Sequence, residues 1–174
     1  MSAAAAAGPV AAPLITVIGI GNPYRRDDGA AGAVLQGLAG QWGDDPRVRL
    51  VELDGESVRV VQAWEGSRSV WIVDAVRSGR PVGTIHEVDA RHLGDLDDSG
   101  KRLGGGHLMG LGEAVDLAGA LDLLPHDLRI LGIEGVDFDN GEGLSAPVAA
   151  GVAAAVEFLS GAIGDALVGS ADPR

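Results

Sequence analysis

Residues 14–20 read Leu-Ile-Thr-Val-Ile-Gly-Ile, a short and mostly β-branched run that ends at the break Gly21-Asn22-Pro23. A continuous apolar run of this length between turn residues is typical of a strand that a parallel sheet buries on both faces. Three further strands are predicted, at residues 48–53, 70–73 and 128–133. The segments between them space their apolar residues as helices do, over residues 28–39, 56–64, 108–123 and 146–158.

Residues 83–88 are predicted to form the one antiparallel strand. Only the short link 77–81 separates them from the strand at 70–73, whereas a parallel crossover takes about a dozen residues or more. The order β-α-β-α-β-β-α-β-α predicts an α/β fold, a three-layer αβα sandwich with a five-stranded, mostly parallel sheet. We expect a single domain over residues 14–164, a flexible N-terminal extension at 1–13 and a frayed C-terminal tail at 165–174.

Two details of the helices are also predicted. In the helix at 56–64, Val58 and Val61 are expected to face the core, with Ala63 as a further candidate. Ser145 is expected to cap the last helix, which has Pro147 in its first turn.

Composition excludes several classes of function. The chain has 174 residues and a formal net charge of −12, which argues against nucleic acid or an anionic membrane as the main partner. It has no cysteine, so disulfides, thiolate metal sites and a cysteine nucleophile are excluded. No apolar run is expected to reach the length of a membrane span, about 20 residues, and the N-terminus lacks the features of a signal peptide. A soluble, cytoplasmic monomer is expected.

Ligands of open parallel sheets bind beyond the carboxyl ends of the strands. Asp74 follows the strand at 70–73, and Asp28 follows the break after the first strand. If these strands are neighbours, the two carboxylates open onto one crevice. His107 follows three glycines at the start of a helix. Two carboxylates and one imidazole would make an open site for Zn²⁺, Ni²⁺ or Mn²⁺.

Each of these residues also has a purely structural interpretation. Asp27 and Asp28 in a first helical turn would stabilise the helix dipole. Asp74 could cap a turn, and His107 could be an ordinary residue at a helix start. The remaining histidines are weaker candidates, because His86 lies near a sheet edge, His92 in a polar loop and His126 in a turn.

Other motifs give less support. Gly19-Ile20-Gly21 invites a dinucleotide-binding interpretation, but Tyr24 stands where G-x-G-x-x-G needs its third glycine, and the acids that follow would repel a pyrophosphate. H-E-x-x-H and G-x-S-x-G do not occur. Residues 137–141 resemble the start of a Ca²⁺ loop, but the glycine comes one place early and the distal glutamate is missing, so a solvated turn is predicted.

Five motifs occur in a fixed order along the chain. The first, residues 19–29, reads Gly-Ile-Gly-Asn-Pro-Tyr-Arg-Arg-Asp-Asp-Gly, and the last, residues 141–145, has the pattern G-x-x-L-S. Between them lie residues 52–55, 70–75 and 105–117. In this order, over residues 14–160, the motifs resemble those of the [NiFe]-hydrogenase maturation endopeptidases.

The resemblance implies a cytoplasmic protease that removes a C-terminal extension from a hydrogenase large-subunit precursor after nickel insertion. The family's metal-contacting trio falls by motif on Asp28, Asp74 and His107. The nickel would be carried by the substrate, and other divalent metals could substitute for it. Because the chain has no cysteine, direct attack by an activated water is favoured over an acyl-enzyme.

The sequence departs from the family pattern at three places. Gly106 and Leu108 stand where the family often has a hydroxyl residue and a glutamine, so a hydrogen bond that orients the imidazole is expected to be missing. Asp28 stands where the family often has Glu. Two other functions stay open, a nickel-dependent maturation scaffold that does not cut and a nucleotide-binding α/β protein.

Overall fold

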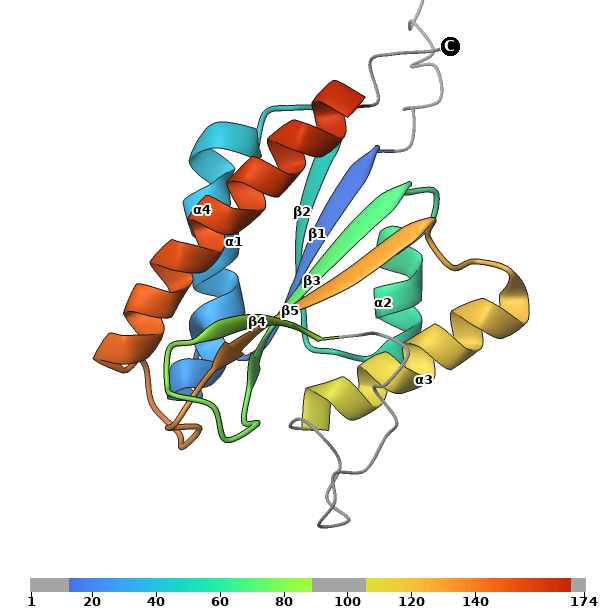
Figure 1. Cartoon of the computed structure of the whole chain (residues 1–174). Helices are drawn as coiled ribbons and strands as arrows, with labels where there is room; N and C mark the ends of the chain where they lie inside the picture. The colour runs from blue at the N-terminus through green and yellow to red at the C-terminus, as the bar shows by residue number, and fades with distance from the viewer. Residues whose placement is uncertain (1–12, 89–105, 170–174) are drawn as a thin grey trace, which may run out of the picture.

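The computed structural model describes residues 13–88 and 106–169, without the side chains of Val88 and residues 106–109. Five strands alternate with helices along this part of the chain (Figure 1). The strands are β1 (Ile15–Ile20), β2 (Val48–Leu53), β3 (Ser69–Val76), β4 (Ile85–Val88) and β5 (Asp127–Glu134). The helices are the 3₁₀ helix η1 (Arg26–Gly29), α1 (Ala30–Trp42), α2 (Ser57–Trp64), α3 (Gly106–Leu121) and α4 (Ala146–Gly169).

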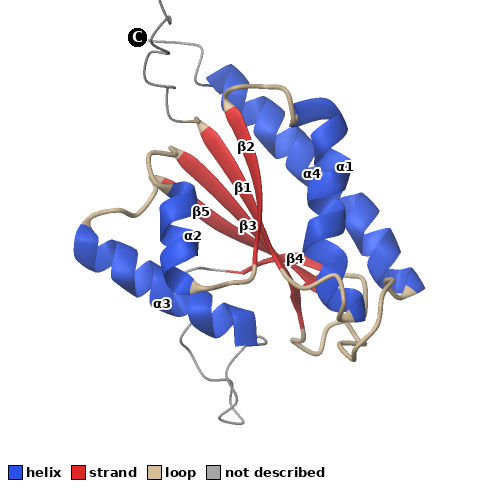
Figure 2. Ribbon diagram, turned by 180° about the vertical axis from the view of Figure 1, so that it is seen from behind, coloured by secondary structure: helices blue, strands red, loops and turns tan. Residues whose placement is uncertain are grey.

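The strands form one sheet in the order β2-β1-β3-β5-β4. All neighbours pair in parallel except β4 and β5, which are antiparallel. Figure 2 shows α1 and α4 on one face of the sheet and α2 and α3 on the other. The predicted three-layer sandwich, with its single antiparallel strand, is confirmed.

Each face of the sheet has its own hydrophobic core. Under α1 and α4 lie Val17, Val73 and Leu131, whereas Ile18, Ile72 and Ile130 lie under α2 and α3. Successive residues of a strand point to opposite faces, so β1, β3 and β5 contribute to both cores. These three strands therefore form the fixed frame on which the carboxyl edge of the sheet is built.

Three local predictions differ from the structure. In α2 the predicted core residues Val61 and Ala63 do pack in the core, but the prediction for Val58 was wrong, because it is 47% exposed while Val60 and Trp64 are buried. The helix begins at Ser57, and the Glu56 side chain accepts hydrogen bonds from the N–H groups of Val58 and Arg59. The last helix does not end near Phe158 but continues to Gly169. A buried stripe supports this length, and its later members are Leu159, Ile163 and Leu167.

The third difference concerns Ser145. It directly precedes α4, as predicted, and its carbonyl oxygen accepts a hydrogen bond from the Ala149 N–H group. Its hydroxyl, however, donates to the Asp27 carboxylate. Residues 165–169 of the predicted tail are helical, whereas 170–174, like 1–12 of the predicted extension, lie outside the described residues.

Contrary to the expectation from sequence, α4 is by length and composition long and apolar enough to cross a membrane. Helices of this length and composition also occur in the cores of soluble proteins. In this structure α4 packs against α1 and the sheet.

Candidate active site

Asp74 lies at the carboxyl edge of the sheet, inside β3 and two residues before its end. It is paired in register with Ile20, the last residue of β1, so the predicted neighbourhood of the two strands is confirmed. Its side chain is only 1% exposed. Because Ile72 and Val76 belong to the core under α2 and α3, the two-residue period of the strand places Asp74 on that same face.

Asp28 reaches the same edge from η1, the turn that connects β1 to α1. It is 2% exposed. Gly21 permits this turn to fold back, because a Cβ at that position would collide with the Asp28 carbonyl oxygen. Since η1 also packs against β3, two of the predicted site residues, Asp28 and Asp74, are buried at one edge of the sheet.

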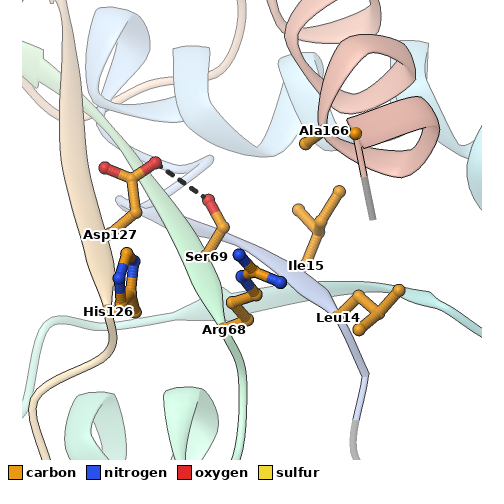
Figure 3. Close-up of a pocket in the computed structure, with 8 residues that line it drawn as sticks. Leu14, Ile15, Arg68, Ser69, His126, Asp127 and Ala166 are labelled. Atoms are coloured by element: carbon orange, nitrogen blue, oxygen red, sulfur yellow. Dashed lines mark hydrogen bonds between the residues drawn. The ribbon is translucent and has the colours of Figure 1, made fainter. Parts of the chain in front are cut away.

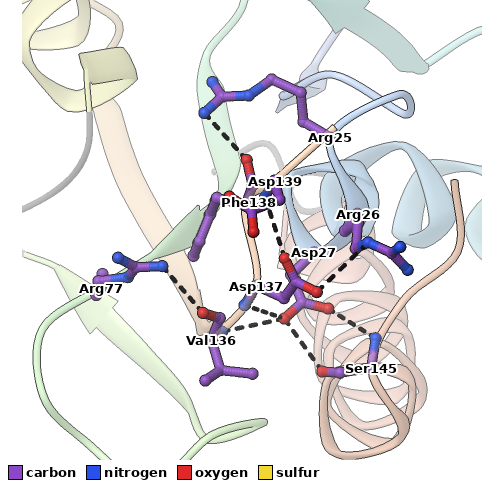
Figure 4. Close-up of polar contacts among 9 residues, drawn as sticks. All are labelled: Arg25, Arg26, Asp27, Arg77, Val136, Asp137, Phe138, Asp139 and Ser145. Carbon is purple, nitrogen blue, oxygen red and sulfur yellow. Dashed lines mark hydrogen bonds and ion pairs between the residues drawn. The ribbon is translucent and has the colours of Figure 1, made fainter. Parts of the chain in front are cut away.

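Asp27, next to Asp28, has a structural role, because its carboxylate is hydrogen-bonded to the loop between β5 and α4 (Figure 4). Its carboxylate accepts hydrogen bonds from the backbone N–H groups of Val136, Asp137 and Ser145 at 2.7–3.0 Å, and from the Ser145 hydroxyl at 3.1 Å. Burial favours the neutral acid, but the hydrogen bonds outweigh it and hold the pKa of Asp27 below its usual value. Asp27 thus fastens the loop between β5 and α4 to η1.

Further contacts reinforce this fastening. Arg25 donates to the Phe138 carbonyl oxygen at 3.2 Å, and the exposed pair Arg26–Asp137 has an N–O distance of 3.4 Å. Arg25 and Gly141 also form an isolated parallel bridge. The segment 137–141, predicted to be a solvated turn, therefore packs against η1, the turn that carries Asp28.

His107 is the second residue of α3, and its side chain lies outside the described part of the structure. The helix itself is placed by Gly110, one turn further on, because a Cβ there would lie 2.5 Å from the carbonyl oxygen of Gly55. Gly55 follows β2 at the carboxyl edge of the sheet. The beginning of α3 therefore lies at the edge that carries Asp28 and Asp74.

Among the side chains that the structure describes, no three of His, Asp and Glu are gathered as a metal site. The predicted trio needs the His107 imidazole, which is not one of them. The metal-binding trio therefore stays a prediction. The two carboxylates and the start of the helix that carries His107 do lie at a common edge of the sheet.

Sequence reasoning missed Glu134, a buried acid at the end of β5. Its carboxylate accepts hydrogen bonds from the backbone N–H groups of Ser78 and Gly79 and from the Ser78 hydroxyl, at 2.7–2.8 Å. Glu134 thus shapes the turn that leads into β4. Its one signal in the sequence was an acid at the end of an apolar strand, the same signal that singled out Asp74.

A hollow of about 370 Å³ lies at the opposite, amino edge of the sheet (Figure 3). It is lined by residues that include Ile15, Arg68, His126 and Asp127. Ile15 and Asp127 begin their strands, so the hollow is separated from Asp74 by the length of β3. His126, an exposed residue at this far edge, is a suitable control position for tests of the site.

Comparison with known proteins supports the resemblance seen in the sequence. The chain is 27% identical over 158 residues to the hydrogenase expression/formation protein HupD of Thiocapsa roseopersicina, covering 85% of this chain and 68% of that protein. It is 26% identical over 151 residues to HupD of Rhizobium leguminosarum bv. viciae, covering 86% and 74%. No protein-family model matches the chain.

Solved structures agree with these sequence relatives. The [NiFe] hydrogenase maturation protease HybD from Thermococcus kodakarensis superposes with a TM-score of 0.69 at 25% identity, over 84% of this chain and 96% of that one. The hydrogenase maturating endopeptidase HybD from E. coli has the same fold, with a TM-score of 0.75 at 18% identity over 87% and 92%. Together with the ordered motifs, these similarities agree with the resemblance to the hydrogenase maturation endopeptidases: the chain is similar in sequence to the two HupD proteins and in fold to solved hydrogenase maturation proteases.

Proposed function

We propose that this protein is an endopeptidase that removes the C-terminal extension of a [NiFe]-hydrogenase large-subunit precursor after nickel insertion. Nickel held by the precursor would be contacted by Asp28, Asp74 and His107. The observation that carries the proposal is the burial of Asp28 and Asp74 at the edge where α3 begins. Carboxylate oxygens gathered at one strand-end edge, beside the start of the helix that carries a histidine, are ligands that a divalent transition ion accepts.

The chemistry would be direct hydrolysis. Water attacks the carbonyl carbon of the scissile peptide and loses a proton, the C–N bond breaks, and the new amine takes up a proton. Nickel supplied with the substrate would lower the pKa of a bound water or polarise the carbonyl. The protein's own carboxylates would fix the nickel-bearing segment against the rim, so that the peptide and the water meet in a defined geometry.

Contact through nickel would also make cleavage depend on prior insertion of nickel into the precursor. A precursor without nickel lacks the ion that the two carboxylates and the imidazole would bind, and it should therefore not be held at the edge. Cleavage would then report that nickel insertion is complete. A cytoplasmic location and a monomeric state fit this role and belong to the same proposal.

The test is cleavage of nickel-loaded and nickel-free precursor by Asp28→Asn, Asp74→Asn and His107→Ala variants. Each variant should fold and lower the cleavage rate by at least about 100-fold, as expected when a group that positions or activates the reactants is lost. The retained extension is measured by intact-protein mass spectrometry. His126→Ala, at the far edge, should cleave at the wild-type rate.

Two outcomes would contradict the proposal. If Asp74→Asn processed the precursor at the wild-type rate, the Asp74 carboxylate would have no role in the reaction. Nickel-dependent association of the wild-type protein with a precursor whose mass never changes would instead indicate a scaffold that does not cut.

A further inference from the structure

His86 lies in the same row across the sheet as Asp74. The register pairs Ile20 of β1 with Asp74 of β3, Asp74 with Gly132 of β5, and Gly132 with His86 of β4. Residues paired in register point to the same face. His86 and Asp74 therefore both point to the side of the sheet that α2 and α3 cover.

Gly132 leaves the position between them without a side chain. The Cε1 and Nε2 atoms of His86 lie 3.3 Å from where a Cβ of residue 132 would be. The far end of the imidazole thus lies over Gly132, next to the Val76 methyl group, whose Cγ2 is 2.9 Å from the same Cβ position. Neighbouring positions of a row are about 5 Å apart, so the ring lies one position away from Asp74 and within reach of a molecule bound there.

The imidazole is neutral and has unused hydrogen-bonding capacity. Nδ1 is buried and makes no hydrogen bond within the described part of the chain. Burial and the positive charge of Arg80 lower the pKa of His86, against the opposing effect of Glu134. A neutral imidazole has one N–H donor and one acceptor nitrogen, so the Nε2 end over Gly132 can hydrogen-bond a backbone N–H or C=O group, depending on the tautomer.

We propose that His86 is a substrate-binding residue, which hydrogen-bonds the backbone of the precursor beside the scissile peptide while that peptide is held at Asp74. This inference rests on the proposed function for the identity of the substrate. It adds a contact from the edge strand β4 to the site, whereas Asp28 comes from η1, which follows β1. The precursor would then be contacted from elements at both ends of the strand order β1-β3-β5-β4.

His86→Ala, His86→Gln and the far-edge control His126→Ala test this contact. With nickel-loaded precursor, His86→Ala should raise KM about 10-fold, the value for one lost hydrogen bond of about 1.4 kcal/mol. His86→Gln should recover most of this loss, because its amide both donates and accepts. Circular dichroism and Tm should match the wild type in all three variants. A wild-type KM for His86→Ala, or equal impairment of both His86 variants, would overturn the inference.

Binding distinguishes this inference from the proposed function. The dissociation constant of fluorescently labelled, nickel-loaded precursor is measured by anisotropy, with precursor mass recorded in parallel. If the wild-type protein binds without cutting, the proteolytic function fails, and a 10-fold weaker Kd for His86→Ala still supports the contact. If the Kd of His86→Ala equals that of the wild type, or if the precursor does not bind at all, the contact is overturned.

Discussion

Two adjacent carboxylates, Asp27 and Asp28, have different roles within one turn of 3₁₀ helix. Asp27 is completely buried and accepts four hydrogen bonds from the segment between β5 and α4. Asp28 is buried beside β3 at the carboxyl edge. Asp27 thereby fixes the position of Asp28, because its hydrogen bonds attach η1 to the loop between β5 and α4.

Asp27→Asn tests this division of roles through the pH dependence of stability. The pKa of Asp27 is lower in the folded protein than its usual value, so its ionisation stabilises the fold above that usual value, and this contribution is lost as pH falls through the folded pKa. At pH 7 the variant should lose about 2 kcal/mol of unfolding free energy, as expected for hydrogen bonds to a charged group. The difference from wild type should shrink at pH 3, measured by urea denaturation.

The exposed acid Asp139, in the same loop, provides the matched control. Asp139→Asn should change the unfolding free energy by less than about 0.5 kcal/mol at either pH. A wild-type stability for Asp27→Asn at pH 7 would show that the buried carboxylate does not fasten the loop.

At the scale of elements, the sequence predicted the order of the five strands along the chain and which of them is antiparallel. Continuous apolar runs identified the buried strands, and the short link 77–81 correctly predicted that β4 is antiparallel. Helix ends were less predictable. α4 continues to Gly169 because tertiary packing against α1 buries a stripe at its far end, and a periodic pattern in an Ala- and Gly-rich sequence does not reveal where that packing stops.

The same limit applies to the site. Asp28 and Asp74 could be predicted because each follows a strand, and strand ends meet at one edge. The separate role of Asp27 could not, because its partners are backbone groups more than 100 residues further along the chain. The sequence makes His86 a weak candidate, because only the register of β4 and β3 against Gly132 places it in the same row of the sheet as Asp74.

The position of α3 depends on a glycine that allows close backbone contact. A Cβ on Gly110 would lie 2.5 Å from the Gly55 carbonyl oxygen, which cannot move away as a flexible side chain can. Gly110→Ala should push the start of α3 off the sheet edge and lower the unfolding free energy by about 1–3 kcal/mol. It should also reduce cleavage, because His107 lies in that first turn.

The exposed Gly119 in the same helix is the control, since a Cβ there meets only Leu124 at an ordinary 3.7 Å. Gly119→Ala should raise the unfolding free energy by about 1 kcal/mol, the usual gain within a helix, and leave cleavage unchanged. Unfolding free energies are measured by urea denaturation and cleavage rates by the precursor assay. Equal effects of Gly110→Ala and Gly119→Ala on both quantities would contradict the proposed role of Gly110.

At the scale of the whole molecule, one sheet carries two cores. Trp71 belongs to the core under α1 and α4, and Trp64 to the core under α2 and α3. Strands β1, β3 and β5 contribute side chains to both. Loss of packing on one face should therefore loosen the strands that support the other, including the edge that carries Asp74.

Leu159→Ala and Leu111→Ala remove a fully buried side chain from one face each. Each should lower the unfolding free energy by about 2–5 kcal/mol, and unfolding should stay a single transition. Midpoints from far-ultraviolet circular dichroism and tryptophan fluorescence should coincide, as two-state unfolding requires. Leu121→Ala, at a residue that is 56% exposed, should change stability by less than about 0.5 kcal/mol. Separate transitions for the two probes in either buried variant would mean that the faces fold independently, and that the edge with Asp74 depends on only one of them.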